Sequence, residues 1–443
     1  MLADDRYLPA RDVEISHPQW CRNATIYQVN TRQFTAVGTF AAAAEHLPRL
    51  KELGVSILWL MPVHPIGESH RKGGLGSPYS VRDYYGVNPE LGTADDLRAF
   101  VASAHELGLR VILDWVANHT AWDCTLLAEH PEWYARDYKG DVTPTPWWDW
   151  DDIIDLDYRV PELRQYMTEA MVHWVREYDL DGFRCDVAGF VPTDFWETVR
   201  RELDQVKPVF LLAEWESRDL HRAAFDMSYA WSWNEALHAI AMGEADVELL
   251  RIFYSWDRKA WPDDSIRMMF VANHDKNAWE GTEYEMFGDA LEAAIVLSVV
   301  GRGMPLVHNG QEAGLRRRLK FFDRDPIEWR NDPMADFYRR LIALRRDTPA
   351  LWSGGWGAHM VPVPNDAPSQ VLSFVRSDER YRVLALFNFS GSPVETALGE
   401  DLYPGHYRDF ASSEVVQLTA GEPVVLAAWG WQVLIATGPP YVA

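Results

Sequence analysis

The chain has 443 residues, of which 47% are hydrophobic, and a formal net charge of −24. This length is too great for one ordinary domain and suits a large domain joined to a smaller module. The negative charge argues against nucleic acid or an anionic membrane as a partner, because both repel an acidic surface. A neutral partner is indifferent to this charge, whose plainest role is solubility.

The start of the chain bears on the compartment. Residues 1–5 contain neither a basic stretch nor a long apolar stretch, so no signal peptide is visible. No apolar run in the sequence is long enough to span a bilayer. We therefore expect a cytoplasmic protein, or a secreted or periplasmic one whose signal has been removed. Residues 1–20 are polar and contain proline, which predicts an N-terminal extension. The oligomeric state stays open.

Strands and helices alternate in the first part of the chain. Thr93 and Asp96 form the pattern of a capping box at the start of one helix, and Gly54 is a stop signal for another. The predicted elements are a strand at 25–29, a helix at 40–53, a strand at 57–60, a helix from about 93 to 107 and a strand at 111–113. This alternation predicts a parallel sheet with helices on its faces.

The alternation pauses between residues 121 and 157. Five tryptophans lie there among proline and aspartate residues: Trp122, Trp133, Trp147, Trp148 and Trp150. A solvated linker lacks such aromatic residues, so the segment predicts a compact insertion. The chain has 21 tryptophans in all, more than a core requires, and aromatic faces stack well on the apolar C–H faces of sugar rings. Most of these side chains are nevertheless expected in the core or in strands.

The alternation resumes after the insertion and then gives way to a different pattern. Pro161 is suited to the first turn of a helix that runs to about residue 178. Further helices are predicted at 194–203, 289–300 and 334–346, and further strands at 209–213, 225–229, 268–271 and 305–307. From about residue 356, alternating runs at 371–375, 381–387, 424–428 and 433–436 predict an antiparallel β-sandwich.

Four short segments place carboxylates or histidines at the ends of predicted strands. They are Asp114-Trp115-Val116-Ala117-Asn118-His119, Gly182-Phe183-Arg184-Cys185-Asp186, Leu211-Leu212-Ala213-Glu214 and Phe270-Val271-Ala272-Asn273-His274-Asp275. Strand ends are where a (β/α)8 barrel carries its catalytic groups. Three carboxylates with arginine and histidine partners suit the hydrolysis of a glycosidic bond.

These segments, in this order and at this spacing, resemble the four sequence regions of the α-amylase family (glycoside hydrolase family 13). The resemblance covers about residues 20 to 350 and implies a (β/α)8 TIM barrel with a short inserted domain B after strand three. With the C-terminal pattern, it predicts barrel segments at 21–120 and 158–352, domain B at 121–157 and a C-terminal antiparallel β-sandwich domain at 353–443.

Asp186 is the candidate nucleophile. Cleavage with retention of configuration needs one ionised carboxylate that attacks the anomeric carbon and one acid that protonates the leaving oxygen. Arg184 lies two positions earlier on the same strand, so it points to the same face and holds Asp186 ionised. Taken alone, the two residues equally well form a buried structural ion pair, and the other three segments favour catalysis.

Glu214 is the candidate acid/base. It follows the apolar run 209–213, where burial raises the pKa of a carboxyl group as a general acid requires. Glu216 is the competing choice, but it lies two positions beyond the strand. Asp275 is the candidate third carboxylate, whose negative charge stabilises an oxocarbenium-like transition state.

The resemblance also implies the residues that bind the sugar. His119 and His274 are expected to bind hydroxyl groups at the cleavage point, with Arg184 beside them. Tyr79 is expected to stack on the sugar next to the cleaved bond, although a loop aromatic that closes the barrel mouth would look the same. Asp114 is expected to be structural, as a support for Arg184 or a loop.

Asn118 and Asp155 match positions that hold a structural calcium ion in many α-amylases, and both offer the oxygen ligands that calcium takes. The pattern departs at Gly189-Phe190, where many amylases have Lys-His. Only a backbone carbonyl is needed from that place, so the calcium hypothesis survives. No organic cofactor is expected.

Two further departures narrow the substrate. Many exo-acting α-glucosidases of the family have an aspartate after the stacking tyrosine and an arginine three residues after the last aspartate, where this chain has Ser80 and Ala278. Val187-Ala188, next to the nucleophile, looks like the second region of neopullulanases and cyclomaltodextrinases. Those enzymes usually carry another N-terminal domain, which 20 residues cannot supply.

The sequence therefore predicts a retaining hydrolase of α-1,4-glucosidic bonds in starch-type glucans or maltooligosaccharides. Transglycosylases or isomerases of the family, such as trehalose synthase, share the same carboxylates and stay open as alternatives, as does a neopullulanase- or cyclomaltodextrinase-like hydrolase. A non-catalytic sugar-binding member is disfavoured, because such members lose catalytic carboxylates.

Overall fold

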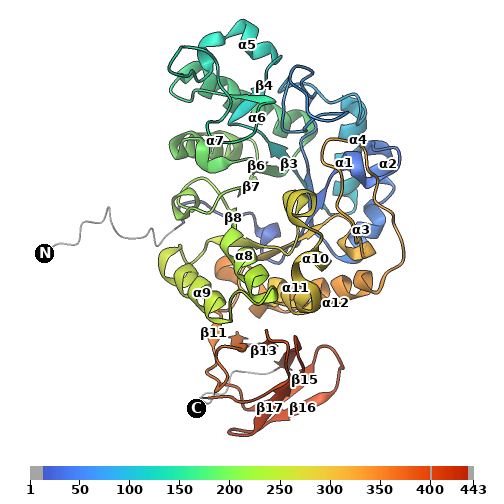
Figure 1. Ribbon diagram of the computed structural model, residues 1–443, viewed down its shortest axis with the longest axis vertical. Coiled ribbons are helices and arrows are strands. Elements are labelled where there is room, and N and C mark those ends of the chain that lie inside the picture. Colours follow the sequence, from blue (N-terminus) through green and yellow to red (C-terminus); the bar gives the residue numbers. More distant parts are fainter. Residues whose placement is uncertain (1–12, 400–401, 438–443) are drawn as a thin grey trace, which may run out of the picture.

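The computed structural model describes residues 13–399 and 402–437. Most of the expected N-terminal extension, including residues 1–5, lies outside these residues. Within them, the dominant feature is a closed barrel of eight parallel strands, which confirms the predicted fold class (Figure 1). No helix in the described part of the chain has the length and apolar character needed to cross a bilayer.

The barrel strands follow chain order around the ring, and the last pairs with the first. Their bounds are β1 Ile26–Val29, β2 Ile57–Leu60, β3 Arg110–Trp115, β6 Gly182–Cys185, β7 Phe210–Ala213, β8 Met227–Tyr229, β9 Ile266–Met269 and β10 Met304–His308. Gly182 is required at the start of β6, because a Cβ atom there would lie 1.8 Å from the carbonyl oxygen of Phe210. The strand ends therefore meet in one ring at one end of the barrel.

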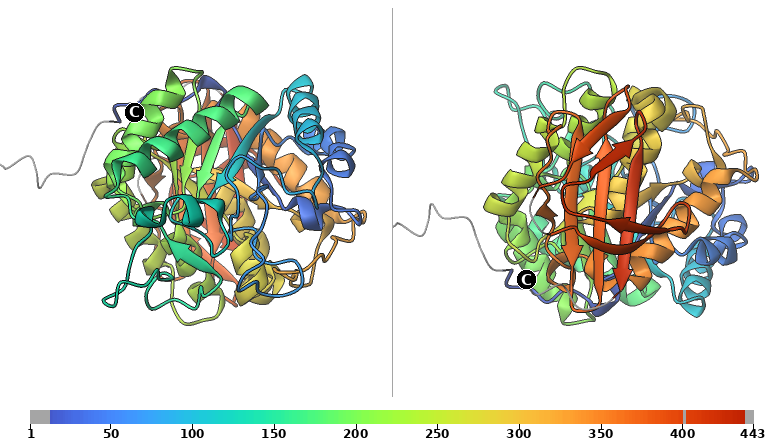
Figure 2. Two further views of the ribbon diagram at one scale, coloured as in Figure 1. Left: turned by 90° about the horizontal axis from the view of Figure 1, so that it is seen from above. Right: turned by 90° about the horizontal axis from the view of Figure 1, so that it is seen from below.

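Helices surround the barrel (Figure 2). Their bounds are α1 Thr31–Phe34, α2 Phe40–Ala44, α3 Leu47–Leu53, α4 Ala94–Glu106, α6 Pro161–Tyr178, α7 Thr193–Asp204, α8 Trp231–Ala241, α9 Glu248–Ala260, α10 Glu283–Phe287, α11 Leu291–Val300 and α12 Pro333–Asp347. The predicted capping box of Thr93 and Asp96 is present at α4, and Pro161 occupies the first turn of α6.

Several predicted elements differ from the structure in their bounds. The single helix expected at 40–53 is two helices, α2 and α3, because Pro48 has no N–H to donate and its ring would clash with the preceding turn. The strand expected at 268–271 begins and ends two residues earlier, as β9. Helices α8 and α9 were not predicted.

The insertion is a small module that rises above the barrel in Figure 1. Strand β4 (His119–Ala121) pairs antiparallel with β5 (Ile153–Asp155), and α5 (Thr125–Glu129) lies between them in the chain. His119 therefore belongs to the first strand of this module and follows β3 by only a few residues. This connection brings the module to the end of the barrel that carries the predicted catalytic groups.

The C-terminal domain consists of two antiparallel sheets, which confirms the predicted class. One has the order β11-β12-β13-β18-β15-β16 and the other pairs β14 with β17. The bounds are β11 Val361–Pro362, β12 Val371–Ser377, β13 Tyr381–Asn388, β14 Val394–Ala397, β15 Gly405–Asp409, β16 Val415–Leu418, β17 Pro423–Leu426 and β18 Trp431–Thr437. Figure 2 (right) shows the larger sheet across one end of the barrel. Arg376 in β12 joins the C-terminal domain to the barrel domain by donating to the carbonyls of Val300 and Gly301, at 3.3 and 2.6 Å.

Candidate active site

Arg184 is the centre of the candidate site. Its guanidinium is completely buried and contacts three carboxylates from three strands. Nη1 donates to Asp114 Oδ1 at 2.7 Å and to Asp186 Oδ1 at 2.8 Å, while Nη2 lies 2.9 Å from Glu214 Oε1. One planar cation thus fixes the positions of the two carboxylates expected to act on the glycosidic bond, and Asp114 supports it as expected.

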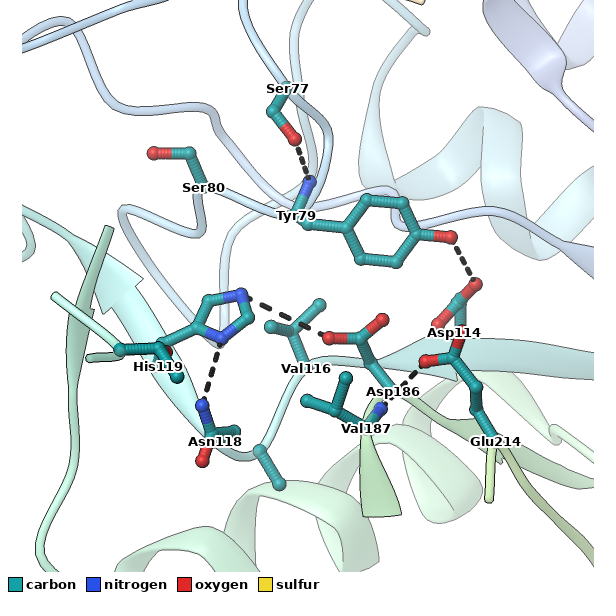
Figure 3. Close-up of polar contacts among 12 residues, drawn as sticks. Ser77, Tyr79, Ser80, Asp114, Val116, Asn118, His119, Asp186, Val187 and Glu214 are labelled. Atoms are coloured by element: carbon teal, nitrogen blue, oxygen red, sulfur yellow. Dashed lines mark hydrogen bonds and ion pairs between the residues drawn. The ribbon is translucent and has the colours of Figure 1, made fainter. Parts of the chain in front are cut away.

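A tight turn after Asp186 brings Glu214 into place (Figure 3). Val187 has φ +36° and ψ 45°, an unusual conformation for a β-branched residue. In this conformation its backbone N–H donates to Glu214 Oε2 at 2.7 Å. The departure at Gly189 has a packing reason, because a Cβ atom there would lie 2.2 Å from the ring of Trp215. The turn after Asp186 and the end of β7 therefore pack directly against each other, through Val187 on Glu214 and Gly189 on Trp215.

Glu216, the competing candidate, has a different environment. It forms an ion pair with Arg267, and it accepts hydrogen bonds from the backbone N–H and the hydroxyl of Ser232 at 3.0 and 2.7 Å. Ser232 lies at the start of α8, so Glu216 fixes a helix end rather than facing Asp186. This placement favours Glu214.

Tyr79, His274 and Asp275 form the opposite part of the site. The Tyr79 hydroxyl donates to Asp114 Oδ2 at 3.0 Å and lies 2.8 Å from His274 Nε2. Because that hydroxyl proton points to Asp114, the proton of the imidazole is on Nε2, which also faces Asp275 Oδ2 at 3.2 Å. Gln28 in β1 donates to His274 Nδ1 at 2.6 Å and fixes this tautomer. The Tyr79 and His274 rings stack with centroids 5.5 Å apart.

His119 approaches Asp186 from the insertion side (Figure 3). The Asn118 side chain donates to His119 Nδ1 at 3.2 Å, so Nε2 carries the proton and lies 3.9 Å from Asp186 Oδ2. That separation is too long for a direct hydrogen bond. Burial lowers the pKa of His119 to about 4, so the ring is neutral at pH 7. The ring also makes a hydrogen bond to the backbone at Tyr79, which fixes it beside the carboxylate.

The pKa values of the two principal carboxyl groups, Asp186 and Glu214, differ. Burial raises the pKa of Asp186 to about 6, against the opposing charge of Arg184. It raises the pKa of Glu214 to about 8, again against Arg184 and with an added contribution from the charge of Asp186. Burial also raises the pKa of Asp275 to about 6. At neutral pH the site therefore holds an ionised Asp186 beside a protonated Glu214, the division of states that acid-assisted displacement needs.

Asn118 and Asp155, the candidate calcium ligands, lie together. Asp155 Oδ1 accepts hydrogen bonds from Thr145 Oγ1 at 2.6 Å and from Asn118 Nδ2 at 3.2 Å. Burial raises the pKa of Asp155, and its partners in the described part of the chain are these neutral groups. Residues 13–399 and 402–437 contain no cluster of three or more His, Cys, Asp or Glu side chains able to hold a metal. The calcium hypothesis therefore stays a prediction.

Three residues of the site were not predicted from the sequence. Gln28 orients His274, Trp59 donates its indole N–H to Asp114 Oδ2 at 3.0 Å, and Tyr229 lies 3.3 Å from Arg184 Nε. Each had a visible signal: Gln28 interrupts an apolar strand, and Trp59 and Tyr229 are large aromatics in strands expected to line the barrel. The partners of these three side chains depend on how the barrel closes, which the sequence does not show.

Comparison with known families and structures shows what the chain as a whole is similar to. The family described as "Alpha amylase, catalytic domain" matches residues 28–353, and "Alpha amylase, C-terminal all-beta domain" matches residues 363–440. A noncanonic maltogenic α-amylase from Thermotoga neapolitana is 31% identical, with a TM-score of 0.86 over 94% of this chain and 99% of that one. An α-amylase from Lactobacillus plantarum is 30% identical, with a TM-score of 0.84 over 95% and 100%.

A curated relative, α-amylase MalA of Haloarcula japonica, is 28% identical over 437 residues, which is 93% of this chain. The chain spans 63% of the length of that relative.

Proposed function

The chain belongs to the α-amylase family of glycoside hydrolases, and we propose that it hydrolyses α-1,4-glucosidic bonds of starch-type glucans with retention of configuration. The observation that carries this proposal is the bridge of Arg184 between Asp186 and Glu214. Retaining enzymes hold their two carboxyl groups about 5–5.5 Å apart, which a single guanidinium spanning both permits.

In the proposed mechanism, the ionised Asp186 carboxylate attacks the anomeric carbon while Glu214 gives its proton to the departing glycosidic oxygen. The products of this step are a glycosyl ester on Asp186 and a free sugar hydroxyl. Glu214, now ionised, takes a proton from water, which attacks the anomeric carbon of this ester and releases Asp186 as a carboxylate. Arg184 stabilises the charge on both carboxylates in each step.

The neighbouring groups would position the sugar. His119 and His274 are neutral rings whose Nε2 atoms lie beside Asp186 and Asp275, where they suit sugar hydroxyl groups. Asp275 adds a negative charge beside the ring as the oxocarbenium character develops. Tyr79 presents its ring next to these groups and suits a stacked sugar.

The carboxyl pKa values predict a bell-shaped pH dependence of kcat/KM. Activity should rise as pH increases through about 6, since Asp186 must lose its proton, and fall above about 8, since Glu214 must keep its own. Because the groups interact, both limbs belong to the site as a whole. A kcat/KM profile from pH 4 to pH 10 checks this, and a maximum below pH 5 would contradict it.

The substrate assignment is tested by product analysis. Starch, maltooligosaccharides, cyclodextrin, pullulan and sucrose would be incubated separately, with chromatography of the products and NMR of the anomer first released. We expect α-anomeric products from maltooligosaccharides, with maltoheptaose cut at internal bonds and preferred over maltose. Release of glucose alone from the non-reducing end, with maltose as the best substrate, would refute this assignment.

The same experiment separates the alternatives. A transglycosylase or isomerase of the family uses the same carboxylates but delivers the glycosyl group to a sugar, so new oligosaccharides or rearranged disaccharides would appear. A neopullulanase- or cyclomaltodextrinase-like hydrolase would prefer pullulan or cyclodextrin to linear chains.

We also propose a structural calcium ion, held by the Asp155 carboxylate and the Asn118 amide oxygen. The support is that Asp155 is a largely buried carboxyl group with neutral partners, a setting that a cation would stabilise. The ion would tie the insertion to the end of β3 and take no part in bond cleavage. Excess chelator should then lower the melting temperature, since an ion bound only by the folded state stabilises it. An unchanged melting curve, with no calcium found by elemental analysis, would reject this ion.

A further inference from the structure

A pocket lies between α9 and the first strands of the C-terminal domain, at the junction seen in Figure 1. Its volume is about 720 Å³, a size usual for the binding pockets of small molecules. Two of its lining residues, Lys259 and Arg302, come shortly before β9 and β10 begin, whereas the candidate catalytic groups follow strand ends. The pocket therefore lies at the opposite end of the barrel from the candidate active site.

The inner part of the pocket is apolar. Val363, Leu372 and Phe374 of the C-terminal domain are buried there. Tyr254 of α9 and Met360 are half-buried and complete the apolar lining. A lining of this kind suits the apolar part of a ligand, which gains free energy by leaving water.

The rim of the pocket is positively charged. Four of its described lining residues are cations, namely Arg251, Arg258, Lys259 and Arg302. The one carboxylate among the described lining residues, Asp257, is neutralised by ion pairs with Arg267 at 3.0 Å and Arg302 at 3.4 Å. This balance is the reverse of that in the whole chain, which has 42 basic and 66 acidic residues. The rim therefore favours an anion, although the net charge of the molecule does not.

Two cations of the rim are unpaired. Arg258 and Lys259 are exposed at the end of α9 and form no hydrogen bond or ion pair within residues 13–399 and 402–437. Arg376 follows Phe374 by two positions in β12, and its guanidinium is buried against backbone carbonyls rather than carboxylates. Burial, with smaller contributions from neighbouring arginines that include Arg302, lowers the pKa of Arg376 to about 9, so it is charged at pH 7. An anion in the pocket would supply the negative charge that these cations lack.

The walls of the pocket are fixed to each other. Arg251 Nη2 in α9 donates to the carbonyl of Val371 at 3.1 Å. The backbone N–H of Val247 donates to the carbonyl of Ser369 at 3.2 Å. Both bonds join the start of α9 to the segment that leads into β12, next to Leu372. A ligand would therefore meet a preformed pocket and lose little free energy in ordering it.

From these observations we propose that the pocket binds a small organic anion in which an apolar ring or chain carries one phosphate or carboxylate group. The apolar part would lie against Leu372 and Phe374, and the anionic group would lie at Arg258 and Lys259. Nucleoside monophosphates and medium-chain fatty acids share this chemistry. The site is separate from the proposed function, and its ligand would stabilise the junction of the two domains because it contacts both.

The first test is calorimetry of the full chain with adenosine 5′-monophosphate and, separately, with octanoate. At least one of them should bind at one site per chain and raise the melting temperature. The separate parts of each ligand are the controls: adenosine and inorganic phosphate for the nucleotide, and octanol for the fatty acid. Each part should bind at least about tenfold more weakly than the whole ligand, because it meets only one half of the pocket.

The second test changes the pocket. Arg258→Glu should weaken binding by about tenfold or more, since it replaces an attraction with a repulsion. Met360→Trp keeps every charge but fills the apolar part, so it should weaken binding as well. Lys51→Glu is the matched charge control, because Lys51 is exposed on α3, and Trp256→Ala is the matched apolar control, because Trp256 is 66% exposed on α9 and does not line the pocket. Both controls should bind as the wild type does, and all four variants should cleave maltoheptaose at the wild-type rate.

The outcomes are distinct from those for the proposed function. Absence of binding by both ligands, or binding by Arg258→Glu and Met360→Trp equal to that of the wild type, would overturn this site. An equal loss in Lys51→Glu would also overturn it, because binding would then depend on surface charge and not on the pocket. Competition by maltoheptaose in the Asp186→Asn variant would place the ligand in the candidate active site instead. Failure of the wild type to cleave any α-glucan would refute the proposed function and leave the binding result unaffected.

Discussion

Replacement of Asp186 by asparagine should leave a folded protein that has lost nearly all activity. The amide cannot form the glycosyl ester, so the lost transition-state stabilisation should lower kcat by about a thousandfold or more, which corresponds to about 4 kcal/mol or more. Folding should survive, since an asparagine oxygen can still accept the hydrogen bond that Arg184 donates at 2.8 Å. The measurement is kcat on maltoheptaose, with circular dichroism and the melting temperature as checks of structure.

Glu214→Gln and Glu216→Gln form a matched pair beside this variant. The first removes the proton donor and should also lose most activity, with a loss that shrinks on substrates whose leaving group needs no protonation. The second removes the ion pair with Arg267 and should act on stability rather than on the chemical step. Activity of Asp186→Asn within tenfold of wild type, or a catalytic loss confined to Glu216→Gln, would contradict the assignment.

The parts of the fold that local chemistry determines were predicted from the sequence. The capping box at Thr93, the proline at the start of α6 and the short apolar strands act within a few residues, so their patterns are readable. The missed elements depend on distant contacts. Helix α8 contains tryptophans, whose preference for strands conceals the helix in the sequence. Strands β14–β16 are short and contain polar residues, so their pairing within the sheets of the C-terminal domain is what establishes them.

The residues of the candidate site were predicted from their positions at strand ends, whereas the contacts among their side chains were not predicted. Asp114, Asp186 and Glu214 each follow an apolar strand, and a barrel brings such ends together. Their common contact with Arg184 depends on rotamers and on the turn at Val187, which no pattern encodes. Ser80 illustrates the limit. In the sequence it was interpreted only as the absence of an aspartate, whereas in the structure its hydroxyl donates to the Asp152 carbonyl and holds the insertion.

Replacement of Arg184 should be the most disruptive single change in the site for stability. Removal of one partner of a buried ion pair costs about 3–5 kcal/mol, because the remaining charge is left uncompensated. Here Arg184→Met would leave Asp114, Asp186 and Glu214 without their common cation. Arg184→Lys keeps the charge but cannot reach all three carboxylates with a planar group, so it should lose less stability and still lose most activity.

The loss of stability should depend on pH in a direction that the pKa values fix. Burial raises the folded-state pKa of Asp114 and Asp186 to about 6, above the ordinary value of an aspartate, so these groups destabilise the folded state as pH rises through that interval. Arg184 opposes this, and without it both pKa values would rise further. The difference in melting temperature between wild type and Arg184→Lys should therefore be wider at pH 8 than at pH 5, and the acid limb of kcat/KM should move to higher pH. Arg164→Lys is the control, because its partner Asp194 is exposed and such pairs contribute about 1 kcal/mol or less. Arg184→Lys retains a cation, so this comparison can be made even if Arg184→Met fails to fold. A difference in melting temperature that is the same at both pH values would mean that Arg184 supports packing alone and does not set the ionisation of the carboxylates.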